Sequence, residues 1–236
     1  MFFLPIELKQ TVPRGPVPVA NALLIAANVL MYLLAPRWTV GYGAVSPGFH
    51  SGPLATLFYG FSHVNMWHLV LNLWALWLFG NPVNRRLGNG YYLVAYLGTV
   101  VAIGLICRFC CPDQGLGASG TIFAVIAIAM ILLPSARLEV AYIIFFPITV
   151  LVGLAAPPKK YLHWFLRWGT IELRTVWCLL LAPLILLVDL LLAGMFSGIW
   201  SWSTGAHLLG MVCGVAIVLL LPTRITMPGR AARTAL

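Results

Sequence analysis

Charged residues are scarce in this chain of 236 residues. They make up 8% of the sequence and only five are acidic, whereas hydrophobic residues account for 61%. Because soluble domains have about 25% charged residues, this composition excludes a soluble protein and indicates several membrane-spanning helices. The few carboxylates form neither an aspartyl-protease pair nor the His-Glu-x-x-His motif of a zinc protease. We therefore expect neither a metal ion nor another cofactor.

The sequence also lacks repeats, low-complexity segments and linkers, so it predicts a single domain. The net charge of +9 does not indicate nucleic-acid binding, because the 14 basic residues are scattered between apolar runs and are typical of topology signals. Residues 1–19 lack the basic start and the small-residue cleavage site of a signal peptide. We interpret them as a cytoplasmic segment that precedes a retained first helix.

Six apolar runs follow, most of them close to the length of a transmembrane helix. We expect an all-α membrane protein in which residues 20–221 form a six-helix domain and residues 222–236 form a cytoplasmic tail. The runs cover residues 20–35, 67–79, 91–107, 119–133, 177–196 and 206–221.

Two polar residues in these runs invite a catalytic interpretation. Ser119 lies in GASG, residues 117–120, at the start of the fourth run, and His207 lies near the start of the sixth. A polar side chain in hydrocarbon is costly and usually marks a functional site. The alternative is structural, because helical serines commonly bond their own backbone and small residues permit close packing. A small-residue face on the sixth run would bring the helices as close as a Ser–His hydrogen bond requires. The face consists of Ala206, Gly210 and Gly214.

The distribution of basic residues predicts the orientation. With a cytoplasmic N-terminus, six crossings place Ser119 and His207 near the outer ends of their helices, so the two side chains can meet. At about 1.5 Å per residue the fourth helix is ~22 Å long, which puts Ser119 below the outer surface of a hydrocarbon core of ~30 Å. The polar loop 112–117 above it predicts a water-filled cavity open to the outside. Cytoplasmic in this arrangement are Lys9, Arg14, Arg85, Arg86, Arg137, Arg224, Arg230 and Arg233, while Arg37 and Arg108 lie outside.

A further apolar stretch, residues 140–156, lies between the fourth and fifth runs. A seventh crossing there would put the serine and the histidine on opposite faces of the membrane. The stretch has about the minimum spanning length and contains Pro147, so we interpret residues 138–175 as an interfacial or re-entrant insertion on the cytoplasmic side. Its aromatic and basic part, residues 161–168, is typical of a segment along the headgroups. A partner-binding or membrane-surface role for the insertion is a hypothesis.

The second run supplies hydrogen-bond donors. His68 and Asn72 are four residues apart and therefore lie on one helix face. With the backbone amide of Ser119 they are candidates for binding the oxygen that becomes negative during acyl transfer, where one donor contributes about 2.7 to 4 kcal/mol. The alternative is that both side chains hold helices together, as polar residues in membranes commonly do.

In combination, these motifs resemble the rhomboid intramembrane serine proteases, and bacterial members in particular. The resemblance rests on HLVLNLW at 68–74, GASG at 117–120 and HLLGMVCG at 207–214, with support from residues 79–88 and 145–148. It implies a six-helix bundle with a short helix four in its centre, located in the inner membrane of a bacterium. It also implies that the partners are transmembrane protein substrates, whose peptide bonds are hydrolysed.

The resemblance implies a role for each matching residue. Ser119 would be the nucleophile and His207 the general base, with His68 and Asn72 as oxyanion donors. In supporting positions, His63 matches a family position near the active site, and Gly117 belongs to the GASG motif. The family often has tyrosine where this chain has Phe123, so we expect the Phe123 ring to stack on His207. Asp189 would complete a triad, but the family requires no carboxylate, and we interpret this residue as bonding a loop.

Alternatives to a protease remain. One is a catalytically inactive rhomboid-like chaperone or scaffold, although such relatives generally lack the nucleophile or the base. A transporter is disfavoured, because the sequence has neither repeat symmetry nor paired intramembrane charges. The sequence leaves the oligomeric state open. Cys107, Cys110 and Cys111 cluster near the expected outer face, where they could oxidise.

Overall fold

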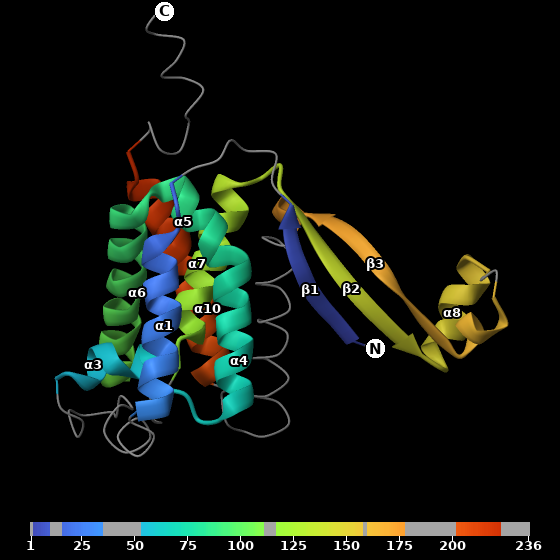
Figure 1. Cartoon of the computed structure of the whole chain (residues 1–236), viewed down its shortest axis with the longest axis horizontal. Helices are drawn as coiled ribbons and strands as arrows, with labels where there is room; N and C mark the ends of the chain where they lie inside the picture. The colour runs from blue at the N-terminus through green and yellow to red at the C-terminus, as the bar shows by residue number, and fades with distance from the viewer. Residues whose placement is uncertain are drawn as a thin grey trace, which may run out of the picture.

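A computed structural model describes residues 2–9, 16–34, 53–110, 117–157, 160–177 and 202–222 of the chain. The helices form a bundle, and a three-stranded sheet leaves one end of it (Figure 1). In chain order the elements are β1 (Phe2–Lys9), α1 (Val19–Leu34), α3 (Ala55–Phe58), η2 (Tyr59–Phe61), α4 (Met66–Ala75), η3 (Leu76–Gly80), α5 (Asn81–Leu87), α6 (Asn89–Cys110), α7 (Ser119–Leu132), β2 (Arg137–Phe145), α8 (Ile148–Ala155), η4 (Tyr161–Trp164), β3 (Leu166–Arg174) and α10 (Trp202–Leu220).

The predicted helices one, two, three, four and six are present as α1, α4 with η3, α6, α7 and α10. Their bounds differ from the predicted ones by a few residues, because a long apolar run fixes a helix more firmly than its ends. In the part of the chain that the structure describes, α6 alone is long and apolar enough to cross a membrane by length and composition. The predicted fifth helix, apart from Trp177, lies outside the described residues.

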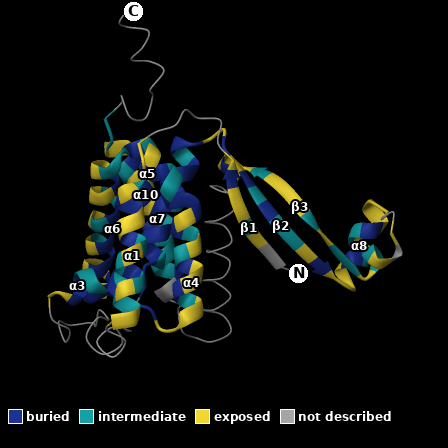
Figure 2. Cartoon of the chain, viewed as in Figure 1, coloured by how far each residue is buried: buried dark blue, intermediate teal, exposed yellow. Residues whose placement is uncertain are grey.

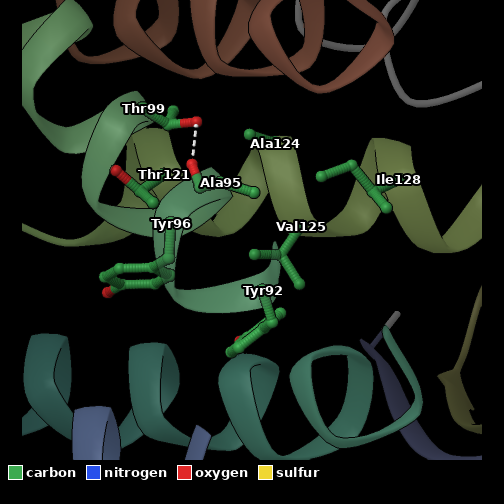
Figure 3. Close-up of a pocket in the computed structure, with 8 residues that line it drawn as sticks. All are labelled: Tyr92, Ala95, Tyr96, Thr99, Thr121, Ala124, Val125 and Ile128. Atoms are coloured by element: carbon green, nitrogen blue, oxygen red, sulfur yellow. Dashed lines mark hydrogen bonds between the residues drawn. The ribbon is translucent and has the colours of Figure 1, made fainter. Parts of the chain in front are cut away.

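Helix α7 lies in the centre of the bundle. Most of its 14 residues are buried, whereas α1, α4 and α6 have exposed outward faces (Figure 2). On one side, α6 packs against α7 through Tyr92, Tyr96 and Val125, and the space between these residues does not hold a water molecule (Figure 3). This packing fixes the helix that begins at Ser119.

A buried polar network joins α1, η3, α5 and α6 at the end of the bundle where α1 begins and α7 ends (Figure 1). The side-chain Nδ2 of Asn21 donates to Leu76 O at 3.0 Å and to Asn81 Oδ1 at 2.9 Å. The Tyr92 hydroxyl donates to Asn21 Oδ1 at 2.6 Å. Because an unpaired buried amide would cost free energy, this pairing makes the helix arrangement specific.

The structure corrects the expectation of an all-α chain. Strand β1 pairs with β2, and β2 pairs with β3, both in antiparallel register. The insertion 138–175 therefore contains a β-hairpin, and residues 1–19 are not a separate segment, because β1 forms the third strand of the same sheet. The sequence of β2, RLEVAYIIF, is rich in β-branched and aromatic residues that fit a pleated, half-buried surface. A short apolar run does not distinguish such a strand from a helix by periodicity.

Ion pairs join the three strands where they leave the bundle. Lys9 Nζ lies 2.8 Å from Glu139 Oε2 and 2.9 Å from Glu172 Oε1, and Arg137 Nη1 lies 3.1 Å from Glu172 Oε2. Hydrogen bonds from Lys9 and then Arg137 lower the pKa of the Glu172 carboxyl. Since most of these side chains are exposed, the pairs contribute more to strand register than to stability. We call β1, β2, α8, η4 and β3 the arm, and residues 145–168 its tip.

Candidate active site

Ser119 and His207 are brought into contact, although 88 residues separate them in the sequence. Ser119 is the first residue of α7, and His207 lies near the start of α10. Ser119 Oγ and His207 Nε2 are hydrogen-bonded at 2.9 Å. When the imidazole is neutral at Nε2, the hydroxyl donates to this nitrogen, which is the geometry that general-base activation of a serine requires.

Small residues allow α7 and α10 to approach until their backbones touch. A Cβ at Gly210 would overlap the carbonyl oxygen of Gly120, and one at Gly214 would overlap the carbonyl oxygen of Ala124. From the other side, a Cβ at Gly120 would lie 3.2 Å from Ala206 O. The predicted small-residue face is confirmed, and it sets the distance between the two helices that carry the serine and the histidine.

The backbone around Ser119 offers further donors. The first four N–H groups of a helix have no acceptor inside the helix, and Ala118, which precedes α7, makes no side-chain cap. These amides point along the helix axis toward the serine end, where the helix dipole also favours negative charge. The site therefore combines a nucleophile with a local preference for an anion.

The imidazole of His68 lies beside the GASG segment. A Cβ at Gly117 would be 2.7 Å from His68 Cε1 and 3.0 Å from His68 Nε2. Gly117 has a φ of 118° and donates its N–H to Tyr59 O at 2.9 Å. Glycine is required here for both its backbone conformation and its lack of a side chain. His68 is thus held against the backbone two residues before Ser119.

Asn65 positions His68, although it is not among the site residues predicted from the sequence. Its Oδ1 accepts the backbone N–H of His68 at 2.9 Å and caps α4. An asparagine directly before an apolar run is a recognised signal for the start of a helix, so the sequence predicts that Asn65 caps α4.

Asn72 lies one turn after His68 on the same face of α4 and is buried, with 7% of its surface exposed. Its side-chain Nδ2 makes no hydrogen bond to any of the described residues. A buried amide donor without a partner is unusual in a folded protein and calls for an explanation. If Asn72 only held helices together, its side chain would donate to such a partner. An oxyanion donor, in contrast, gains its partner only when substrate is bound.

Two ring contacts surround the histidines. His63 is buried and meets His68 edge to face, with ring centroids 5.1 Å apart. Phe123 lies one turn after Ser119 in α7 and stacks on His207, with centroids 4.4 Å apart and an angle of 21° between the rings. The expected stacking is confirmed, and the phenylalanine ring limits the orientations that the His207 imidazole can adopt.

Comparison with known proteins identifies the family. Residues 50–157 match the Rhomboid domain. The chain contains a Rhomboid domain. It is 28% identical over 136 residues to the mitochondrial presenilin-associated rhomboid-like proteins of Bos taurus and Homo sapiens, covering 53% of this chain and 36% of each relative. It is 30% identical over 122 residues to the mitochondrial Rhomboid protein 1 of Saccharomyces cerevisiae, covering 48% of this chain and 34% of that protein.

The Rhomboid domain establishes a helical fold integral to the membrane. The narrower expectation of a bacterial member has no support from these relatives, which are mitochondrial proteins of eukaryotes. This rhomboid spans about a third of the length of the curated relatives it matches. The matched domain includes Ser119, His68 and Asn72, and it ends before His207.

Some expected features of this rhomboid lie outside the residues that the structure describes. Among the residues that it does describe, no group of three or more His, Cys, Asp or Glu side chains is arranged to hold a metal ion. Among the described cysteines, Cys110 and Cys213 are free thiols. Outside lie Asp189, Cys111, Lys159 and the residues 112–116 and 197–201.

Proposed function

We propose that this rhomboid is an intramembrane serine endopeptidase that hydrolyses peptide bonds of transmembrane protein substrates. The observation that carries the proposal is the 2.9 Å contact between Ser119 Oγ and His207 Nε2. In an apolar helix bundle such a pair is costly unless it is used. The inactive chaperone or scaffold has no comparable support, because it needs no serine aligned with a base.

In the proposed reaction, His207 removes the hydroxyl proton as Ser119 Oγ attacks the substrate carbonyl carbon. The oxygen of that carbonyl becomes negative in the tetrahedral intermediate, and His68, Asn72 and the Ser119 N–H stabilise it. His207 then gives the proton to the leaving amine, and water later hydrolyses the acyl-enzyme in the same way. The Phe123 ring keeps the imidazole in position through both steps, in place of a triad carboxylate.

We further propose a six-helix bundle with α7 as its short central helix, cytoplasmic termini and an active site that opens to the outer face. Support comes from Figure 1, in which the start of α1, α5 and the end of α7 share one end of the bundle. Ser119 and His207 lie toward the other end. The basic pair Arg85 and Arg86 is in the last turn of α5, at the end that the positive-inside rule assigns to the cytoplasm.

Labelling by a fluorophosphonate tests the nucleophile directly. We expect the reconstituted chain to form a covalent adduct, because these reagents react with serines activated by a base. Mass spectrometry of the digest should locate the adduct at Ser119, and Ser62, a buried serine whose Oγ donates to Phe58 O, is the internal control. An adduct elsewhere, or none in a chain that cleaves transmembrane peptides, would contradict the serine mechanism.

Alanine variants of His68 and Asn72 test the oxyanion donors. If each side chain donates to the oxyanion, each variant should lose about 10²- to 10³-fold in kcat, equivalent to about 2.7 to 4 kcal/mol. The measurements are steady-state cleavage of a transmembrane peptide and the unfolding midpoint in detergent. A lower unfolding midpoint with kcat unchanged would instead mean that the side chain holds helices together. The control variant is His163→Ala, in η4 of the arm.

A further inference from the structure

The tip of the arm has an ordered interior and an apolar exterior. Inside, Thr149 Oγ1 donates to Trp164 O at 2.6 Å, Phe146 N donates to Phe165 O at 2.9 Å, and a Cβ at Gly153 would lie 2.6 Å from the Trp164 ring. The α8 segment and the η4 turn therefore close on each other around the Trp164 ring. The outer surface is apolar and belongs to a structured unit.

Large apolar side chains cover this outer surface. The most exposed are on α8, where Leu151 is 69% and Leu154 is 73% exposed. Apolar patches of this kind on a folded protein mark an interaction site. The other exposed members are Phe145, Phe146, Ile148, Leu162, Phe165 and Trp168.

The charges of the arm are distributed unevenly along its length. The acidic residues of the arm are Glu7, Glu139 and Glu172, and all three lie at its base, where Glu139 and Glu172 form ion pairs with Lys9 and Arg137. Between residues 140 and 171 the sequence has three basic residues and no acidic one. An apolar patch on a segment with basic residues and no acidic ones is complementary to anionic lipid headgroups above acyl chains.

The position of the arm also indicates that its partner is the lipid bilayer. It leaves the bundle beside α5 and the end of α7 and then turns back, so that α8 is level with the bundle helices (Figure 1). A chain of this family is integral to a membrane, so the tip points toward the bilayer and not away from it. Trp74 of α4 donates its indole N–H to Pro5 O at 2.8 Å, which ties β1 to the bundle and fixes this direction.

We propose that the tip is a lipid-binding element that inserts into the interfacial zone of the leaflet at the α5 end of the bundle. The side chains of Leu151, Leu154 and Phe165 contact the acyl chains. Lys160 and Arg167 bind the phosphates of anionic lipids, because long basic side chains can extend to the headgroups while their stems remain in apolar surroundings. The sheet then sets the tilt of the bundle in the membrane.

Quenching of a fluorescent amino acid tests this proposal on the full chain in lipid nanodiscs. The probe replaces Leu154 at the tip or, as the matched control, the exposed Arg174 at the base. We expect doxyl-labelled lipid to quench the tip probe strongly and aqueous iodide to quench it severalfold less than the base probe. Equal quenching by iodide at both positions would overturn the proposal.

Two further arms of the experiment exclude other partners of the tip. In discs that hold a single chain the lipid quenching should persist, and its loss there would assign the tip to a second copy of the chain. The variant K160Q/R167Q should reduce lipid quenching in discs rich in phosphatidylglycerol and leave it unchanged in phosphatidylcholine. An equal effect in both lipids would rule out the proposed preference of Lys160 and Arg167 for anionic lipids. Because the readout is not proteolysis, the result is independent of the proposed catalytic function.

Discussion

Replacing Ser119 by alanine should lower kcat for a transmembrane peptide by roughly 10⁴- to 10⁶-fold, the range found when a nucleophile or its base is removed from a serine protease. The physical reason is that the hydroxyl at 2.9 Å from His207 Nε2 is the group that forms the covalent intermediate. His207→Ala should have an effect of similar size. The measurement is single-turnover cleavage in proteoliposomes, compared with the parent chain.

The double variant S119A/H207A provides the stricter test. Residues that act as one unit are strongly non-additive, so the double variant should lose no more activity than Ser119→Ala alone. Losses that multiply would mean that the two residues act independently, and cleavage that survives in Ser119→Ala would exclude it as the nucleophile. The unfolding midpoint of each variant should remain close to that of the parent chain, which shows that the bundle is intact.

The second large effect is expected at Gly210. A leucine there places its Cβ against the backbone carbonyl of Gly120, and neither the Cβ nor the carbonyl can rotate away. Overpacking of this kind costs about 1 to 3 kcal/mol, and a displacement of about 1 Å between reacting groups costs about 10²-fold in rate. Gly210→Leu should therefore lower both the unfolding free energy in bicelles and kcat.

Gly98→Ala is the control at a glycine that packs against nothing. Gly98 is also in the middle of a long apolar helix, α6, but a Cβ there would meet no atom within 4 Å. Alanine should be neutral or slightly stabilising, since it lowers the backbone entropy of the unfolded chain. If Gly210→Leu and Gly98→Ala behaved alike in both measurements, the contact between α7 and α10 would not control the site.

The helices and the meeting of Ser119 with His207 were predictable because a membrane imposes simple rules. An apolar run of sufficient length becomes a helix, and the distribution of basic residues orients the crossings. Small residues at helical spacing then bring the two helices together. The positive φ of Gly117 and its contact with His68 were not predictable, because they depend on how α4 passes the GASG segment.

The sheet was missed for a different reason. Most of strand β2 lies in the apolar run 140–156, and periodicity alone cannot assign a short continuous apolar run to a strand or to a helix. Its partner β1 is far away in the sequence, and pairing between such distant segments leaves no local signal. The cap at Asn65 is different, because an asparagine before an apolar run predicts a helix cap. That the cap also holds the backbone of His68 follows from the same signal.

The pairing of β1 with β2 has a consequence for the order of folding. Phe2 is opposite Ile143 in the sheet, so β1 has no partner strand until α1, α4, α6 and α7 have been synthesised. Contacts between distant segments form late because the intervening chain must first be ordered. We therefore expect the early helices to insert into the membrane before β1 pairs with β2 and completes the sheet.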